Sequence, residues 1–314
     1  MVNVTVVGEV IVDRVITGGA HIDVAGGSAA NTALALVKAG NRVDLRARYS
    51  KDDLGQYLKR SALSQGIGLA NSISAKEPAT LVEIDLDYAG VPHYRFMLHG
   101  TADWQWTQDE ISKPLPPETD AIIIGSLATM IEPGAHVLFN WAQSVKSEAT
   151  LLCFDPNARP TALEMLGIAD SARNLIVEWV GISDIVKVSD EDLAWIDPHQ
   201  SPLDVAAQWS LRGPKLVVLT QGSKGAAAFV EGKLVCALPA VEVQVVDTVG
   251  AGDTFFAWLV QGYLSLAPEE RLESFSLLDV MAVANQAAAL NCAERGCNPP
   301  MRHKLRRFMP KSMS

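Results

Sequence analysis

The sequence predicts an α/β fold with a mainly parallel central sheet that is flanked by helices. Four short apolar runs have the length of buried strands, at 121–124, 151–154, 184–188 and 216–219. Helical stretches stand between them, at 135–145, 162–179 and 203–211. Because each helix returns the chain to the start of the next strand, this alternation indicates parallel strands covered by helices.

Length and composition fit a single soluble domain. The 314 residues can bury a substantial core, and the proline-containing loops at 113–117 and 197–202 are too short to be interdomain linkers. Hydrophobic residues make up 48% of the chain and charged residues 20%, as in ordinary globular proteins. We therefore expect one domain over residues 1–314.

The net charge of −10 argues against a surface for nucleic acid or anionic membrane. Phosphorylated ligands stay open, because backbone amides bind phosphate without side-chain charge. The four cysteines lack metal-ligand spacing and are expected to be reduced thiols of a cytoplasmic protein. The first residues lack a basic segment and indicate a strand rather than a signal peptide, and no apolar run approaches transmembrane length.

The N-terminal part of the chain is richer in β-like runs. We expect strands at 2–7, 10–15, 21–24 and 43–49. Two helices are expected, one closed by Gly40 and one running from Asp53 to near Gly66. Runs at 80–86 and 93–98 flank a turn at 87–90 and predict a hairpin.

Two β-rich pieces, residues 10–24 and 78–103, do not fit the alternation of strands and helices. Such an excursion can form a lid over a site at the edge of the sheet. The same strands can instead extend the central sheet, and the pattern favours neither interpretation.

The most informative stretch runs from 241 to 260. An apolar β-branched run at 241–246 leads into Asp247, a small-residue turn, Asp253 and an amphipathic run, which predicts a strand, a tight glycine loop and a helix start. The first N–H groups of a helix lack partners and suit an anion. A carboxylate beside a bound phosphate can take the proton of an attacking hydroxyl. The alternative is an ordinary turn whose aspartates cap the helix.

The nine residues Asp247-Thr248-Val249-Gly250-Ala251-Gly252-Asp253-Thr254-Phe255 resemble, residue for residue, the C-terminal signature of the ribokinase/PfkB family of carbohydrate kinases. The resemblance implies a ribokinase-like fold with a small β lid, ATP and Mg²⁺ as cofactors, and phosphoryl transfer to a sugar hydroxyl. It also implies that Asp253 is the base and that the amides of Gly250, Ala251 and Gly252 stabilise the transferring group.

The segment 25–31 places glycines and an amide side chain at a helix start. Taken by itself, it is a loop with a helix N-cap. It resembles the family's N-terminal glycine pair, and the opening Gly8-Glu9 with Asp13 also resembles the family. The resemblance implies sugar contacts, from Asp13, Gly26, Gly27 and Asn31.

Two further segments follow predicted strands. Phe154 to Pro160 is by itself an Asx-Pro turn, and it resembles the Asp-Pro-Asn-x-Arg of fructokinase and 2-keto-3-deoxygluconate kinase relatives, which makes Arg159 a candidate for substrate contacts. Lys187 to Asp192 stands in place of the family's Asn-x-x-Glu but reads Ser-x-x-Asp. The resemblance implies that Lys187 and Ser189 face the nucleotide and that Asp192 serves magnesium; a plain acidic helix start explains it equally well.

Residues 219–226 resemble the family's Thr-x-Gly-x-x-Gly hairpin, which implies that Thr220, Gly222 and Gly225 lie against the nucleotide. A P-loop and a dinucleotide-binding glycine motif are absent from the sequence. In the family, the region that corresponds to the apolar helix from Asn285 closes the adenine pocket and supplies carbonyls for a monovalent cation. The resemblance therefore implies a K⁺ site near Asp247 and Val249.

Fructose is our first choice of substrate, because 155–159 and Ala102-Asp103-Trp104 resemble fructokinase-type members. 2-Keto-3-deoxygluconate is second, with ribose or a nucleoside behind. Four aromatic residues of the lid segment can stack on a sugar or a base, or can belong to a dimer contact or the core, which we favour: Tyr94, Phe96, Trp104 and Trp106. From another class, a non-catalytic sugar or nucleotide sensor is the alternative, and an intact Asp253 argues against it.

Overall fold

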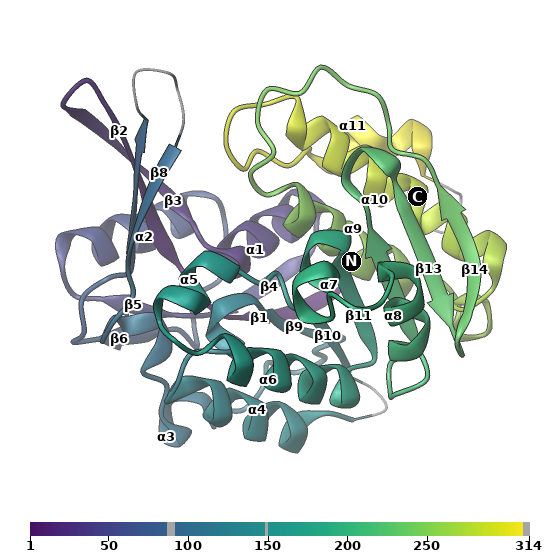
Figure 1. The fold of residues 1–314 in the computed structure, drawn as a ribbon, viewed down its shortest axis with the longest axis horizontal. Helices are drawn as coiled ribbons and strands as arrows, with labels where there is room; N and C mark the ends of the chain where they lie inside the picture. Colours follow the sequence, from purple (N-terminus) through teal and green to yellow (C-terminus); the bar gives the residue numbers. More distant parts are fainter. Residues whose placement is uncertain (87–91, 148–149, 310–314) are drawn as a thin grey trace.

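The central sheet has eight strands in the order β14-β13-β12-β11-β10-β9-β1-β4. The computed structural model describes residues 1–86, 92–147 and 150–309. The strands are β1 Asn3–Val7, β4 Arg42–Arg46, β9 Ala121–Gly125, β10 Leu151–Asp155, β11 Ile185–Ser189, β12 Leu216–Thr220, β13 Ala226–Val230 and β14 Lys233–Leu238. From β4 to β12 the neighbours run parallel, and β13 and β14 add an antiparallel edge (Figure 1). The predicted mainly parallel sheet is confirmed.

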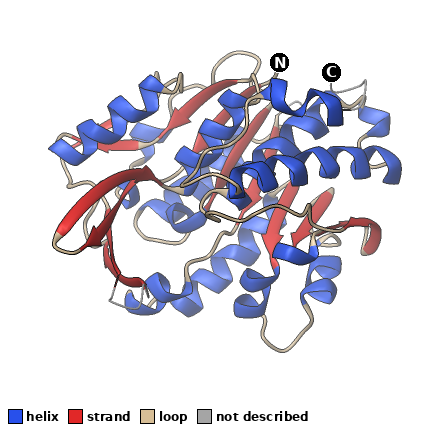
Figure 2. Ribbon diagram, turned by 90° about the horizontal axis from the view of Figure 1, so that it is seen from above, coloured by secondary structure: helices blue, strands red, loops and turns tan. Residues whose placement is uncertain are grey.

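Helices cover both faces of this sheet (Figure 2). One face packs against α1 Ser28–Lys38, α2 Asp53–Ser64, α9 Ala251–Ser265 and α10 Ser274–Cys292. The other packs against α4 Gly134–Val145, α6 Ala169–Ile182 and α8 Pro202–Trp209. Short helices complete the set, namely α3 Gln108–Ile111, α5 Pro160–Met165, α7 Asp190–Ile196 and α11 Arg302–Leu305. Along β9, Ala121 and Ile123 face the first layer and Ile122 and Ile124 the second, which explains why the strands are apolar throughout.

The β-rich pieces form a second sheet and do not extend the first. Its order is β3-β2-β7-β8, and it stands away from the body (Figure 1). The strands are β2 Ile11–Thr17, β3 Ala20–Gly26, β7 Leu81–Leu86 and β8 Pro92–Met97. The antiparallel pairing of β7 with β8 confirms the predicted hairpin, whose turn at 87–90 lies outside the described residues. We call these four strands the small sheet.

The predicted strand at 241–246 is wrong. This segment has no strand partner among the described residues, and Val245 and Val246 are exposed. The N–H groups of Val246 and Asp247 both donate to the carbonyl of Cys292 at the end of α10. The β-branched run therefore crosses the surface as an extended segment that is tied to a helix end.

Two other predicted elements are divided. The strand at 43–49 is two strands, because β4 pairs with β1 whereas β5 (Arg48–Ser50) pairs with β6 (Ile73–Ala75). The helix at 162–179 is α5 and α6, separated at Gly167. That glycine has φ of +69°, and its N–H and that of Ile168 donate back to carbonyls of α5, which ends the helix.

The aromatic residues of the predicted lid segment have different environments. Trp104 and Trp106 are buried in the core, whereas Tyr94 is exposed and stacks on Phe96 at 6.0 Å between ring centroids. The four cysteines are free thiols, as expected. Within the described ranges, no helix combines the length and apolar character that crossing a bilayer requires.

Asp103 connects the two segments that precede β2 and β7 of the small sheet. Its Oδ1 accepts the N–H of Val10, and its Oδ2 lies within hydrogen-bond distance of the Thr80 hydroxyl. The Thr101 hydroxyl lies 2.9 Å from the carbonyl of Leu98 and 2.7 Å from the Thr80 hydroxyl. Thr80 has a single proton for its contacts with Thr101 and Asp103, so that a Thr80 proton directed at Thr101 requires a protonated Asp103 carboxyl. Burial raises the pKa of Asp103 to about 7, which agrees with this assignment.

We predict that Asp103→Asn is at least as stable as the wild type near pH 8, because the amide can donate to Thr80 and accept from Val10 as the protonated acid does. The pKa of Asp103 is higher in the folded state than its ordinary value of 3.8. Its contribution to the free energy of unfolding is therefore full below about pH 4 and is lost as the pH rises through about 7. The advantage of the Asn variant should grow from about pH 5 to about pH 8.

Urea unfolding of the wild type and the Asn variant at about pH 5 and about pH 8 measures these differences in the free energy of unfolding. Asp103→Ala serves as the comparison, because it leaves the buried N–H of Val10 unpaired and should lose about 1–3 kcal/mol. An Asn variant that loses as much stability as the Ala variant near pH 8 would contradict a protonated Asp103.

Candidate active site

The glycine loop before α9 presents unpartnered backbone donors. Gly250 is the N-cap of α9, with φ of +75°. The N–H of Ala251 donates to the carbonyl of Thr248 at 3.2 Å, and the N–H of Thr254 donates to that of Gly250 at 2.8 Å. The N–H groups of Gly252 and Asp253 find no acceptor among the described residues. Together with the dipole of a 15-residue helix, they favour an anion at this position.

Asp253 lies beneath these donors and is buried, with 5% of its surface exposed. The hydroxyl of Ser28 donates to its Oδ1 at 2.7 Å, and Asn31 Nδ2 donates to its Oδ2 at 2.9 Å. Ser28 and Asn31 are three residues apart and therefore share one face of α1, which packs against α9. The structure thus brings the predicted base and the predicted sugar ligand Asn31 into direct contact.

A buried ion pair lies beside the loop. Lys187 Nζ is 2.8 Å from Asp155 Oδ2, and both side chains are almost fully buried. Burial raises the pKa of Asp155 to about 6, and the ammonium of Lys187 opposes that rise. Burial lowers the pKa of Lys187, but the carboxylates of Asp155, Asp192 and Asp253 together outweigh it and the net direction is upward. A Cβ on Gly252 would lie 3.0 Å from Lys187 Nζ, so the ammonium sits against the glycine loop.

Asp13, in β2 of the small sheet, contributes a carboxylate to the site. No described residue donates a hydrogen bond to Asp13, and burial raises its pKa to about 6 against the opposing charge of Arg159. Its Oδ2 would lie 2.4 Å from a Cβ on Gly26. Gly27 has φ of +103°, and a Cβ there would be 2.5 Å from the carbonyl oxygen of Glu9. Both glycines are therefore required for this close approach.

The loop after β10 carries a polar side chain into the centre of the site. Asn157 has φ of +37°, and its Nδ2 donates to Ser28 Oγ at 2.9 Å and lies 3.4 Å from Asp253 Oδ1. The predicted Asx turn is present as well, because Asn157 N–H donates to Asp155 Oδ1 at 3.2 Å. Arg159 is exposed, and its Nη1 donates to Asn157 Oδ1 at 2.5 Å.

The Ser189–Asp192 segment is a capping box at the start of α7. Ser189 Oγ accepts the N–H of Asp192 at 3.0 Å. In turn, Asp192 Oδ2 accepts the N–H of Ser189, and its Oδ1 accepts the N–H of Ala158 at 2.9 Å. The carboxylate therefore fixes the loop after β10. Its role as a magnesium ligand stays a prediction.

Four of the residues predicted to face the nucleotide lie outside the hydrogen-bonded cluster around Asp253. Thr220 ends β12, and its hydroxyl donates to the carbonyl of Val188 at 3.4 Å. Gly222 and Gly225 have positive φ, and a Cβ on Gly225 would lie 2.0 Å from the carbonyl oxygen of Leu238. Asn285 Nδ2 donates to the carbonyl of Pro239 at 2.7 Å. None of these contacts reaches Asp253, so the structure does not join this group to the base.

Asp247 and Val249 lie where the segment before α9 meets the C-terminal loop. Asp247 Oδ1 accepts the N–H of Val249 at 3.0 Å, and its Oδ2 accepts the N–H of Gly296 at 2.9 Å. The carbonyl of Val249 accepts Asn291 Nδ2 at 2.8 Å. Each of these oxygens keeps a lone pair, so the set fits a cation with oxygen ligands. Within the described ranges, no group of three or more His, Cys, Asp or Glu side chains could hold a metal ion.

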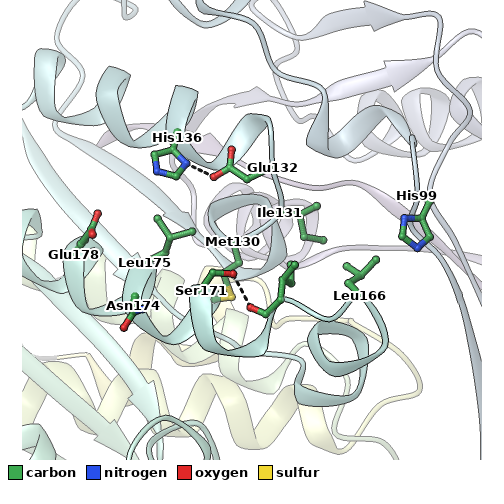
Figure 3. Close-up of a pocket in the computed structure, with 11 residues that line it drawn as sticks. His99, Met130, Ile131, Glu132, His136, Leu166, Ser171, Asn174, Leu175 and Glu178 are labelled. Atoms are coloured by element: carbon green, nitrogen blue, oxygen red, sulfur yellow. Dashed lines mark hydrogen bonds and ion pairs between the residues drawn. The ribbon is translucent and has the colours of Figure 1, made fainter.

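A separate pocket lies away from this site. A pocket of about 450 Å³ is bounded by the segment before α4, by α6 and by His99, and its walls mix apolar and polar side chains (Figure 3). His136 pairs with Glu132 at its rim. None of the predicted site residues lines it. The polar side chains of the candidate site gather around Asp253 instead.

Sequence reasoning missed Ser28, Asp155 and Asn157 as individual residues. All three stand inside segments that it singled out. Their local explanations, a helix start and an Asx-Pro turn, are also correct. Their common contact with the surroundings of Asp253 joins positions 96 to 225 residues apart, which leaves no local signal.

A model of the pfkB family of carbohydrate kinases matches residues 3–304. The chain is 26% identical over 304 residues to a fructokinase from Klebsiella pneumoniae, covering 95% of this chain and 96% of that protein. It is 30% identical over 238 residues to a fructokinase from Rhizobium leguminosarum bv. trifolii, covering 75% and 70%. A double mutant of fructokinase from Vibrio cholerae O395, solved with fructose, ADP and potassium ion, has a TM-score of 0.83 at 23% identity and covers 99% of both chains. The predicted ribokinase-like fold is confirmed.

We predict that Gly250→Ala is more destabilising than Gly296→Ala. Both glycines have positive φ, at +75° and +65°, so each variant carries the backbone penalty of roughly 1–2 kcal/mol. A Cβ on Gly250 would also lie 2.4 Å from Cys297 Sγ, whereas one on Gly296 meets no atom within 4 Å. The collision should add about 1–3 kcal/mol to the loss in free energy of unfolding. Urea unfolding measures both, and equal losses would show that the loop relaxes around the methyl group.

Proposed function

This chain belongs to the pfkB family of carbohydrate kinases, and on that premise we propose that it transfers the γ-phosphoryl group of ATP to a hydroxyl group of fructose. The family and the fructokinase relatives make it an ATP-dependent sugar kinase. Fructose as the acceptor rests on the names of those relatives and on the Asp155-Pro156-Asn157-Ala158-Arg159 segment.

The observation that carries the proposed mechanism is Asp253, buried beneath the unpartnered N–H groups at the start of α9. In the proposed step, Asp253 accepts the proton of the acceptor hydroxyl. The oxygen of that hydroxyl forms a bond to the γ-phosphorus, while the bond between the γ-phosphorus and the bridging oxygen breaks and ADP leaves. The loop amides and the ammonium of Lys187 stabilise the charge on the transferring group. The nucleotide would bring Mg²⁺, which would neutralise phosphate charge.

The proposed acceptor site lies on the small-sheet side of Asp253. Asp13 has unused acceptor capacity and suits sugar hydroxyls, Arg159 is exposed nearby, and Gly26 and Gly27 leave room. We propose that the small sheet closes over this site and excludes water, which would otherwise compete as acceptor. Asn31 donates a hydrogen bond to the base Asp253, and we propose that it contacts the sugar while it holds that bond.

The nucleotide is proposed to lie along the loops that carry Thr220, Gly222, Gly225, Ser189 and Asn285. The oxygens of Asp247 and Val249 are proposed to hold K⁺, and the remaining lone pairs on those atoms support it.

A homodimer through the small sheet is also proposed. Ile22 and Val24 alternate outward on β3, and Tyr94 is exposed on β8.

The decisive experiment measures ADP release with Mg-ATP and potassium across fructose, 2-keto-3-deoxygluconate, ribose and adenosine. We expect turnover with fructose, and a loss of roughly 10²–10⁴-fold in kcat for Asp253→Asn, with ATP binding kept, because the amide cannot take the proton. Near-normal turnover of the Asn variant would remove Asp253 from the base role. ATP binding without Asp253-dependent turnover on any acceptor would favour the sensor, and turnover on another acceptor would replace fructose.

A further inference from the structure

Three side chains in series end on Asp253. Arg159 Nη1 donates to Asn157 Oδ1 at 2.5 Å, Asn157 Nδ2 donates to Ser28 Oγ at 2.9 Å, and the Ser28 hydroxyl donates to Asp253 Oδ1 at 2.7 Å. The series begins at an exposed guanidinium and ends at a buried carboxylate.

The direction of every bond in this series is fixed by the donors present. A guanidinium can only donate, so the oxygen of the Asn157 amide faces Arg159 and its nitrogen faces Ser28. Since Ser28 Oγ accepts from Asn157, its single proton is free to point at Asp253. All three donors therefore polarise in the same sense, toward the carboxylate.

The series also determines which oxygen of Asp253 is left for chemistry. A carboxylate oxygen has about two acceptor positions. Oδ1 is occupied by the Ser28 hydroxyl and by the longer contact of 3.4 Å from Asn157. Oδ2 receives only Asn31 Nδ2 among the described residues. One acceptor position on Oδ2 is thus open.

We propose that Ser28 is a positioning residue for the kinase reaction, and that Arg159, Asn157 and Ser28 together hold Asp253 so that Oδ2 accepts the proton of the sugar hydroxyl. This inference rests on the proposed function. Ser28 acts through Asp253 and contacts neither the acceptor hydroxyl oxygen nor the γ-phosphorus. Because the charge of Arg159 acts on Asp13, the series also links the proposed acceptor site to the orientation of the base.

Deleting the Ser28 hydroxyl tests the proposal. Ser28→Ala removes one hydrogen bond to a charged group and should lower kcat by roughly ten- to a hundredfold, with the KM for ATP within about twofold of the wild type. Ser28→Thr keeps a hydroxyl and should restore most of the loss. Ser274→Ala is the matched control, because Ser274 is also the first residue of a helix and also donates from its hydroxyl, to the carbonyl of Val235 far from Asp253. It should leave kcat unchanged.

A double-mutant cycle separates a connected series from independent contacts. Asn157→Gly keeps the tolerance for positive φ and removes the donor to Ser28 without placing a new charge beside Asp253. The double variant with Ser28→Ala should be no slower than the slower single variant.

Wild-type kcat kept by Ser28→Ala, or losses in the cycle that multiply, would overturn the inference while the kinase stands. Absence of wild-type turnover on every acceptor would overturn the proposed function itself. Urea unfolding of each variant ensures that kcat is compared between equally folded proteins.

Discussion

A buried carboxylate must be surrounded by donors, and Asp253 imposes that requirement on the whole site. Its donors come from two separate places, the first turn of α1 and the loop after β10. The chain can bring these together only because parallel strands end at the same edge of the sheet, where each following loop or helix starts. The central sheet thus places the donors that stabilise the buried charge of Asp253.

The same requirement extends outward from Asp253. Asn157 can reach Ser28 because its loop is held at both ends, by the ion pair of Asp155 with Lys187 and by the bond from Ala158 N–H to Asp192. These groups have complete structural explanations. They nevertheless fix the position of an amide that contacts the base, so that structural and functional roles coincide in the same atoms.

The sequence was most informative where one physical cause decides the outcome. Fully apolar runs such as 121–124, set between helical stretches, predict strands covered on both faces, and they are. The run at 241–246 is also rich in valine but carries Glu242 and Gln244, and its end is tied to the free carbonyl at a helix terminus, a partner of which composition carries no trace. Gly167 was equally ambiguous, since a glycine within a helical pattern becomes a stop only when its φ is positive. In the site, glycines and aspartates stood out because their chemistry is unusual, whereas Ser28 and Asn157 belong to types common at helix starts and turns.

Charge is distributed along the site in a way that orients two substrates in the proposed reaction. On the side of the small sheet, Asp13 and Glu9 are carboxyls with pKa values raised by burial, so this end is costly for another anion and suits hydroxyl donors. On the side of α9, unpartnered N–H groups and the ammonium of Lys187 suit phosphate. A nucleotide entering with its phosphates toward Asp13 would meet carboxyls, and one entering toward α9 would meet donors. Asp253 stands at the boundary, which is where a hydroxyl held by one end and a phosphoryl group held by the other must meet.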